Sequence, residues 1–258
     1  MIFGEFAKCQ AEAEYPELWQ GLVGAWSPCV SPSGGTVLRD LSGFGNHGVL
    51  TNMDQTNDWV ISKGYPALDF DGINDVVSCS NVEVLSQVTL QMWLTPTTIS
   101  SDRGICGRTS SNSWNNGYGL SGQTSSTVYF WVNAYNSANT VSATVTAGAL
   151  THIRCVYDLS RQEIWVNGIL AQSKSVTAAL TSGGTFTIGE LGGWTTRYIG
   201  TIHEVALYRA RAPSTYHLGP GGMFRPRRRR WNYATAQTAI PYWVFARKNA
   251  RLIGGGVS

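Results

Sequence analysis

Short runs of alternating apolar and polar residues dominate the chain between residues 22 and 209. In Val88–Thr95 the apolar side chains recur at every second position, which places Leu90, Met92 and Leu94 on one face of an extended strand. Runs of the same kind occupy residues 128–132, 153–157, 163–166, 185–188 and 202–208. Clusters of Gly, Ser, Asn and Asp separate them at close intervals, as in antiparallel sandwiches and barrels. We expect an all-β, two-sheet antiparallel sandwich whose core includes Leu90, Met92, Leu94, Ile153, Cys155 and Ile188.

Two local patterns refine this expectation. Asn167-Gly168 lies between two apolar runs and predicts a tight hairpin, because both residues tolerate the positive φ angles of a type I′ turn. Residues 7–20 are rich in Ala and Glu and predict a short helix that is broken near Pro16. The strands are not interrupted by helical patterns, which excludes a doubly wound α/β fold and a TIM barrel.

Composition excludes several classes of protein. Charged residues make up 14% of the 258 residues and aromatic residues 11%, which is atypical of intrinsically disordered chains. The sequence contains no run of 18 apolar residues and does not begin with a secretory signal, so we expect neither a transmembrane segment nor a signal peptide. The five cysteines form no C-x-x-C pair, and we expect free thiols without disulfides, as in a reducing cytosol: Cys9, Cys29, Cys79, Cys106 and Cys155.

The charge is distributed unevenly along the chain. Residues 1–204 carry 9 Lys/Arg and all 16 Asp/Glu, a net charge of −7, whereas residues 205–258 carry 10 Lys/Arg and no acid. An acidic body and a basic C-terminal segment are expected to do different jobs.

Five segments occur in the order that is typical of one family of β-sandwiches. They are Leu22–Trp26, Asp40–Thr51 (DLSGFGNHGVLT), Ala67–Val77 (ALDFDGINDVV), Thr151–Asp158 with Ile164–Gly168 (THIRCVYD, IWVNG), and Gly200–Tyr208 (GTIHEVALY). This ordered set resembles the laminin-G-like, or concanavalin A-like, jelly-roll domains. The resemblance implies a jelly roll over 22–212 and a short closing helix after it. Together with the patterns on either side, we expect an N-terminal arm with a short helix over 1–21, and a short helix followed by a basic, aromatic arm over 213–258. The resemblance leaves function open, because the fold hosts lectins, adhesins, glycosidases and structural modules.

Catalytic patterns are not evident. Glycoside hydrolysis needs two carboxylates across the scissile bond, and glucanases of this fold place them on one strand as E-x-D-x-E. The corresponding stretch Glu163–Asn167 holds a single acid. The four histidines are scattered: His47, His152, His203 and His217. We expect a protein that is not an enzyme, with a glycoside hydrolase as a minor alternative.

A structural calcium ion is the one cofactor that the resemblance suggests. In relatives, calcium is held near an aspartate of the last strand, but this chain has His203 there, and an imidazole is a poor ligand for a hard cation. The oxygen donors that remain as weak candidates are Asp40, Asp71, Asn74, Asp75 and Glu204.

Glycan binding is the non-catalytic use that the family suggests. Two polar loops, Ser113–Tyr118 and Gly192–Tyr198, bring aromatic rings beside amides, an arrangement on which sugars can stack. The candidate glycan-binding residues are Trp114, Asn116, Tyr118, Trp194 and Tyr198. A tryptophan in a Gly/Asn-rich loop is not expected in the core, although it could instead plug a neighbouring subunit or cover the sandwich rim.

The segment after the last strand combines a linker, a basic cluster and an apolar run. Gly and Pro in Gly219–Trp231 predict a linker. The basic cluster could contact nucleic acid, an acidic protein surface or solvent. The run Ala239–Phe245 is apolar and aromatic, as a protein interface would need and phosphate binding would not. We therefore expect docking on another protein chain, with nucleic acid disfavoured, through Arg227, Arg228, Arg229, Arg230, Trp231, Tyr242, Trp243 and Phe245.

The jelly roll and its arginine-rich arm together resemble laminin-G-like proteins encoded by tailed phages. This resemblance implies a non-catalytic virion protein, such as a head decoration or tail-attached adhesin, made in the host cytoplasm. Its partners would be other virion proteins or copies of itself, with glycans on the outward-facing jelly roll. A free-standing or cell-surface carbohydrate-binding module is the alternative.

Overall fold

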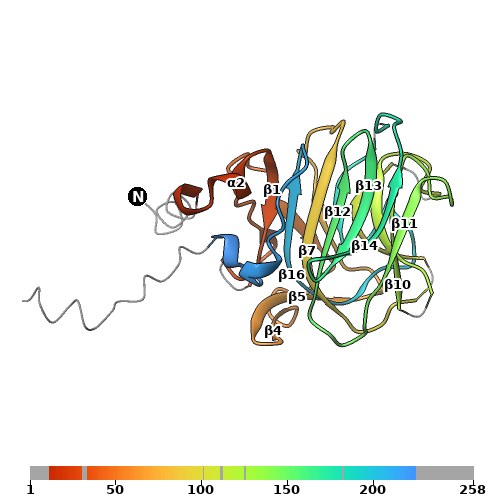
Figure 1. Cartoon of the computed structure of the whole chain (residues 1–258). Coiled ribbons are helices and arrows are strands. Elements are labelled where there is room, and N and C mark those ends of the chain that lie inside the picture. Colours follow the sequence, from red (N-terminus) through yellow and green to blue (C-terminus); the bar gives the residue numbers. More distant parts are fainter. Residues whose placement is uncertain are drawn as a thin grey trace, which may run out of the picture. The chain divides into compact units, whose positions relative to one another are not determined.

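Two antiparallel sheets pack face to face in the structure, a computed structural model that describes residues 12–30, 34–100, 102–110, 113–124, 126–181 and 183–224 (Figure 1). Sheet I has the strand order β14-β13-β12-β7-β16-β5-β4, and β1 also pairs with β16. Its strands are β1 (Leu22–Trp26), β4 (Trp59–Ser62), β5 (Tyr65–Asp71), β7 (Val88–Pro96), β12 (Thr151–Tyr157), β13 (Arg161–Val166), β14 (Ile169–Ser175) and β16 (Ile199–Tyr208). The expected all-β sandwich is confirmed.

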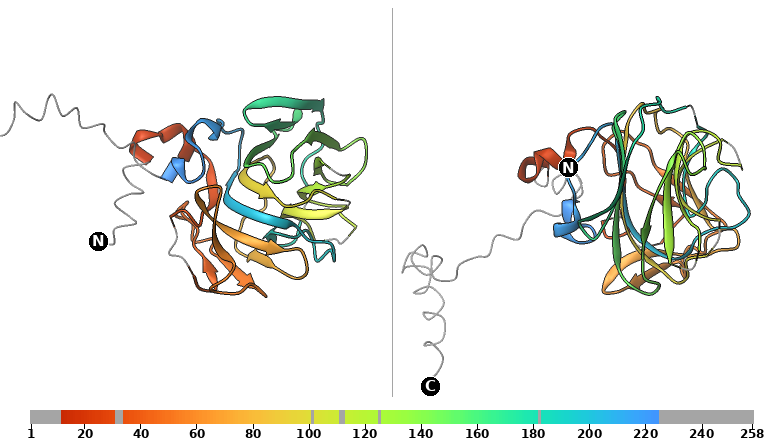
Figure 2. Two further views of the ribbon diagram at one scale, coloured as in Figure 1. Left: turned by 90° about the horizontal axis from the view of Figure 1, so that it is seen from below. Right: turned by 45° about the vertical axis from the view of Figure 1, so that its right-hand side comes forward.

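Sheet II has the strand order β11-β10-β9-β8-β15-β6-β3-β2. Its strands are β2 (Val37–Leu38), β3 (Gly48–Thr51), β6 (Val76–Cys79), β8 (Arg103–Arg108), β9 (Tyr118–Gly122), β10 (Thr127–Val132), β11 (Thr140–Thr144) and β15 (Phe186–Ile188). The views in Figure 2 show the two layers edge-on and from below.

The main core lies between the sheets and follows the alternation of the sequence. On β7, Leu90, Met92 and Leu94 are each at most 1% exposed and face the other sheet. All six predicted core residues are buried in this cluster. Burial of a side chain such as Leu90 contributes roughly 1.5–3 kcal/mol to folding. Cys79, Cys106 and Cys155 are free and buried here, and burial raises the pKa of each thiol.

The local predictions are confirmed where the structure describes them. Asn167 and Gly168 have φ of 49° and 79° and join β13 to β14 in a tight turn. The helix α2 (Pro16–Trp19) begins at Pro16, because proline fits the first helical turn, where its missing N–H costs nothing. In the part of the chain described, none of the helices has the length and apolar character needed to cross a membrane.

The chain after β16 crosses the outer face of sheet I. We call Arg209–Phe224 the strap; it contains two 3-10 helices, η1 (Tyr216–Leu218) and η2 (Gly222–Phe224). The prediction of a linker over Gly219–Trp231 is wrong for residues 219–224, because Met223 and Phe224 are 0% and 4% exposed; residues 225–231 lie outside the described residues. They pack with α2 and β1 in a second apolar cluster, in which the rings of Phe224 and Trp19 meet edge to face with centroids 6.0 Å apart.

Candidate functional site

Aromatic side chains gather on the outer face of sheet II. On β10, Val128, Phe130 and Val132 face the core, so Tyr129 and Trp131 face outward. Three rings from neighbouring loops join them. Together they form what we call the aromatic cluster: Trp114, Tyr129, Trp131, Tyr135 and Trp194.

Two glycines make room for the base of this cluster. Gly107 on β8 and Gly119 on β9 are register partners, and Trp131 is the partner of Gly119 on the other side. A Cβ at Gly119 would lie 2.7 Å from the indole of Trp131, and a Cβ at Gly107 would lie 2.7 Å from the Leu191 side chain. The side chains of Trp131 and Leu191 therefore pack directly against the sheet backbone at these glycines.

Trp114 contacts most of the other rings of the cluster. Trp114 is stacked on Trp131 with centroids 6.0 Å apart, and its Nε1 donates to the carbonyl of Leu191 over 3.2 Å. Trp194 lies 5.6 Å and Tyr135 5.3 Å from Trp114 by ring centroids. Tyr135 also meets Tyr129 edge to face at 6.2 Å. Tyr129, Tyr135 and Trp194 are half-buried, so each presents part of its ring to solvent.

A polar pair borders the tyrosines. Gln123, just after β9, donates from Nε2 to Oδ1 of Asp102 over 2.9 Å. Burial, followed by the charge of Asp102, raises the pKa of Tyr135 to about 12, so its hydroxyl stays protonated at neutral pH. Rings, a carboxylate, an amide and a phenol hydroxyl therefore share one surface, and these are the groups that read the faces and hydroxyls of sugars.

Three buried donors around the cluster lack hydrogen-bond partners among the described residues. They are the Ser121 hydroxyl and the indole N–H groups of Trp131 and Trp194. Ser121 is the register partner of Tyr129 and is 0% exposed. A buried polar group without a partner is uncommon and is expected to have a reason, such as a water molecule or a ligand group.

The structure brings together two of the five predicted glycan-binding residues, Trp114 and Trp194. Trp114 is not expected in the core, and it lies outside the main core; it is nevertheless only 4% exposed, because it packs with Trp131 and Leu191 and supports the other rings. Asn116 holds its own loop: Oδ1 accepts from the Thr109 hydroxyl over 2.9 Å and from the Ser110 N–H over 3.0 Å.

Tyr118 and Tyr198 lie in the main core instead. They are 2% and 1% exposed, and burial raises the pKa of both phenols. In this arrangement neither ring is accessible to a sugar.

Sequence reasoning missed Tyr129 and Tyr135. The strand over 128–132 was recognisable, and its alternation already indicates that Tyr129 and Trp131 share the face opposite the core. Tyr135 has no comparable pattern, because its place depends on contacts with Trp114 and Tyr129 from other segments.

The weak metal candidates serve as local hydrogen-bond acceptors. The Asp40 carboxylate accepts from the backbone N–H groups of Ala25, Ser42 and Asn46 over 2.9 Å each. Glu204 accepts from the Gly221 N–H of the strap over 2.5 Å. No three His, Cys, Asp or Glu side chains are grouped as metal ligands within the described ranges.

Asp71, Asn74 and Asp75 form one loop. Asp75 accepts from the Asp71 N–H over 3.0 Å, and the Asn74 carbonyl accepts from the Asn52 amide over 3.1 Å. Burial raises the pKa of Asp75 to about 6, so this carboxyl is a weaker attraction for a cation than an ordinary aspartate.

The outer face of sheet I is polar but closed by the strap. Gln91 on β7 donates to the Pro213 carbonyl over 2.8 Å and accepts from the Thr215 N–H over 3.0 Å. Arg154 on β12 donates to the Ala212 carbonyl through Nε and a second guanidinium nitrogen, at 3.1 and 2.6 Å.

Aromatic stacking completes this cover. The half-exposed Tyr216 ring of the strap lies on Trp93 with centroids 5.7 Å apart. The His152 ring packs against both, and its Nε2 is 3.2 Å from the Thr215 hydroxyl. Burial, with a smaller effect of the Arg154 charge, lowers the pKa of His152 to about 3.

Two further carboxylates beside this face are held by an arginine. Arg211 of the strap binds Glu163 over 2.7 Å and Asp158 over 2.9 Å. Burial opposes ionisation of Asp158, but hydrogen bonds from Ser160, Arg161 and Arg211 outweigh it and lower its pKa. A general acid for glycoside hydrolysis needs a raised pKa, which this carboxyl does not have.

Arg211 and Arg209 also change the picture of the charge distribution. Both were assigned to a basic tail by sequence position, but they pair with acids of the jelly roll; Arg209 lies 3.3 Å from Glu83. The remaining basic and aromatic docking candidates, residues 227–231 and 242–245, lie outside the described residues.

Comparison with known proteins identifies the family. The model described as the concanavalin A-like lectin/glucanases superfamily matches residues 71–215, more than half of the chain. No curated protein sequence matches the chain.

Solved structures share the fold at low sequence identity. Domain 4 of AbnA, a GH43 extracellular arabinanase from Geobacillus stearothermophilus solved with arabinotriose, has a TM-score of 0.57 and 15% identity. The match covers 79% of this chain and 96% of that domain. A mutant Trypanosoma rangeli sialidase with trans-sialidase activity has a TM-score of 0.60 and 16% identity, over 83% of this chain and only 36% of the sialidase. The binding domain of Paraclostridial Mosquitocidal Protein 1 has a TM-score of 0.56 and 15% identity, over 76% of this chain and 50% of that one. The chain belongs to the concanavalin A-like lectin/glucanase superfamily.

Proposed function

We propose that this protein is a non-catalytic glycan-binding module that receives its ligand on the aromatic cluster of sheet II. The observation that carries the proposal is the grouping of three half-buried rings, Tyr129, Tyr135 and Trp194, beside the hydrogen-bonded pair of Asp102 and Gln123. Partly exposed rings offer apolar faces for sugar C–H groups, and the polar pair offers a donor and an acceptor for hydroxyls.

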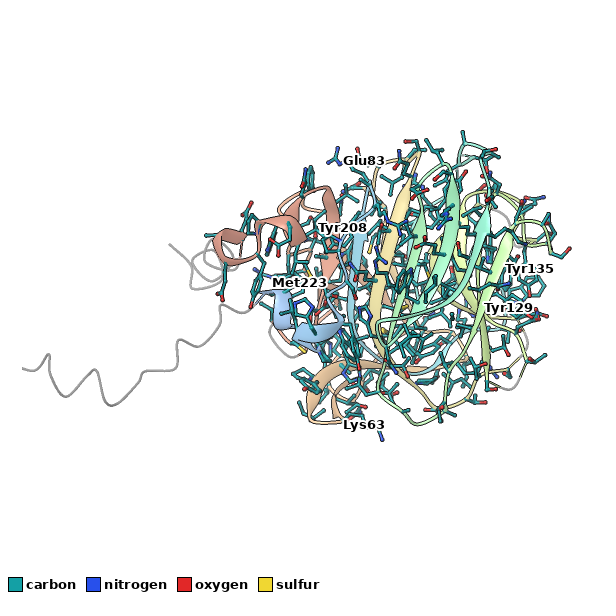
Figure 3. All side chains as sticks on the ribbon, in the orientation of Figure 1. Lys63, Glu83, Tyr129, Tyr135, Tyr208 and Met223 are labelled. Atoms are coloured by element: carbon teal, nitrogen blue, oxygen red, sulfur yellow. The ribbon has the colours of Figure 1, made fainter. Side chains whose placement is uncertain are left out.

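The position of the cluster agrees with this role. Tyr129 and Tyr135 lie at one end of the sandwich, whereas Met223 lies at the other, near α2 (Figure 3). Trp19 and Phe224 bring the first and last described segments into contact at that second end. A module tethered through either terminal segment would therefore present the aromatic cluster away from its attachment.

Binding to an array of neutral oligosaccharides that includes arabinotriose tests the proposal. Tyr135→Ala and Trp194→Ala should each lower affinity by about tenfold, which corresponds to about 1.4 kcal/mol of lost ring contact. Tyr216→Ala is the matched control, because it removes a half-exposed tyrosine from the strap on sheet I. Loss of binding in Tyr216→Ala alone would move the site to sheet I, and no binding to any glycan would refute the function.

Absence of catalysis is part of the same proposal. The engagement of both Glu163 and Asp158 by Arg211 supports it. Incubation with the bound oligosaccharide should release no new reducing ends. Hydrolysis that survives in Glu163→Gln but disappears in Tyr135→Ala would instead indicate an active site at the aromatic cluster.

We also propose that residues beyond 224 attach the module to a larger assembly, a virion in the setting that the resemblance to phage-encoded proteins implies. The clustering of α2 with η2 supports a single attachment end. A chain that ends at residue 224 should keep its fold and its glycan binding but lose assembly. The cut falls after Phe224, because Met223 and Phe224 belong to the packed strap. Within the arm, Trp243→Ala with Phe245→Ala should abolish docking, whereas neutralising two arginines should mainly slow it.

A further inference from the structure

Asp102 occupies an unusual backbone position beside the aromatic cluster. Its φ is 59°, in the left-handed region that aspartate and asparagine tolerate better than most residues. It directly precedes β8, and its side chain is tied across to Gln123 beyond β9 by the 2.9 Å hydrogen bond. Only one carboxylate oxygen, Oδ1, takes part in this bond, and no other hydrogen bond to the Asp102 carboxylate is formed among the described residues.

Asp102 lies next to the tyrosine side of the cluster, because its partner Gln123 follows by two residues Ser121, the register partner of Tyr129. Its charge reaches Tyr135. Its carboxylate contributes to the raised pKa of Tyr135, second to burial. A negative charge that disfavours a phenolate at this hydroxyl also disfavours other anions at the same place, because the interaction depends only on charge and distance.

Cations on the adjoining segments are engaged elsewhere. Arg103 donates to the Ser100 hydroxyl over 2.5 Å and to the Arg197 carbonyl over 2.7 Å. Arg197 itself pairs with Glu190 at 3.3 Å. Lys174 donates to the carbonyls of Ser137, Ala138 and Thr140 in the loop that follows Tyr135. Among the described residues, Asp102 therefore has no ion-pair partner.

We infer that Asp102 restricts the aromatic cluster to neutral glycans and excludes sugars that carry a carboxylate, such as sialic and uronic acids. This inference rests on the proposed glycan-binding function and names its ligand class. In the bound state, the Asp102 carboxylate accepts hydrogen bonds from sugar hydroxyls and the Gln123 amide donates to them. The same carboxylate, which forms no ion pair among the described residues, repels an acidic sugar.

The experiment compares neutral and acidic glycans that share a core. Lactose with 3′-sialyllactose, and galactotriose with trigalacturonic acid, are included in an array of such pairs, and affinities are measured for wild type, Asp102→Asn and Tyr135→Ala. Asparagine keeps the left-handed backbone and the hydrogen-bonding oxygen but removes the charge. Wild type should prefer the neutral member of each bound pair by about tenfold or more at low salt, and less at high salt.

The two variants separate the inference from the proposed function. Asp102→Asn should bind neutral glycans more weakly than wild type, because an amide oxygen accepts a hydrogen bond less strongly than a carboxylate, whereas the preference over the acidic partner should collapse to near unity. If wild type prefers acidic glycans, or if Asp102→Asn discriminates as strongly as wild type, the inference is wrong while glycan binding stands. If Tyr135→Ala binds every glycan as wild type does, the location of the site fails, and the inference with it.

Discussion

The outer faces of the two sheets differ in whether the chain itself covers them. On sheet I the side chains of Gln91, Arg154 and Glu204 are matched by groups of the strap from the same chain. On sheet II the aromatic cluster keeps half-buried rings and three buried donors without partners among the described residues. A polar, histidine- and acid-bearing face is thus a closed internal interface, whereas the face with few charges remains open. Polarity alone therefore does not locate a binding site in this fold; the partner of each polar group has to be found first.

Removing the end of the strap should produce the largest change. Phe224→Ala deletes a ring that is 4% exposed and packs against Trp19, and it should lower the free energy of unfolding by about 3–5 kcal/mol. Chemical denaturation measures this loss. Glycan binding of the folded fraction should stay unchanged, since the aromatic cluster lies on the other sheet. A parallel loss of affinity in the folded protein would mean that the two faces are coupled.

Acidification should weaken the closed face. The pKa of His152 is about 3 when folded, against about 6.5 when unfolded, so the unfolded chain binds the proton more readily between these values. Stability should thus be complete above pH 6.5 and fall as pH decreases, by about 3 kcal/mol from this histidine at pH 4.

A variant isolates the contribution of His152. Asp75, with its pKa raised to about 6, gains protons on folding and gives the opposite slope, so wild type alone is not informative. His152→Gln should show a shallower loss of stability than wild type between pH 6.5 and 4. Identical slopes in the two proteins would contradict the burial of His152 under the strap.

Substitutions of Gln91 test the hydrogen bonds of the strap, and we expect them to cause a smaller loss of stability than Phe224→Ala. Gln91→Ala removes the partners of the Pro213 carbonyl and the Thr215 N–H and should destabilise the protein by about 1–3 kcal/mol. Gln91→Glu keeps the acceptor for Thr215 but buries a carboxylate oxygen against the Pro213 carbonyl at a position that is 1% exposed, and should destabilise the protein at least as much as Gln91→Ala. Thermal unfolding at pH 7 distinguishes the three proteins.

Ser121 should show the smallest effect. Its hydroxyl is buried on sheet II without a partner among the described residues, so Ser121→Ala removes a desolvated group and breaks no described bond. Stability should stay within about 0.5 kcal/mol of wild type or rise slightly. A loss above about 1 kcal/mol would show that the hydroxyl is satisfied in solution, for instance by a bound water.

Local sequence patterns were sufficient to predict the fold, whereas the candidate site depends on contacts between residues that are distant in the sequence. The alternation in Val88–Thr95 and the turn at Asn167-Gly168 depend on neighbouring residues, so the sequence alone predicts them. The polar loop around Trp114 indicates that this ring lies outside the main core, but it does not indicate how deeply the ring is buried. Its seat is made by Trp131 and by the carbonyl of Leu191, 77 residues away, and no local pattern reports such a partner.

The sequence also did not predict the packing of the strap on sheet I, because its contacts are with residues that are distant in the sequence. Gln91 and Arg154 bind the carbonyls of Pro213 and Ala212, which are far away in the sequence. The Gly and Pro content that predicted a linker reports only the local flexibility of the backbone. Met223 and Phe224 were visible as apolar residues, but their docking place on α2 and β1 is set by the fold.

The path of the strap has a mechanical consequence. From β16 it runs over β7 to β12, where Ala212 meets Arg154, and returns to β16, where Gly221 meets Glu204. A force applied at Phe224 would load these contacts in series: first the packing on Trp19, then the Gly221 bond, then the Tyr216 stack and the bonds of Thr215 and Ala212. Contacts loaded in series break one at a time. Under tension the strap would therefore detach and extend stepwise, and it would dissipate mechanical energy before the force reaches the strands of the sandwich.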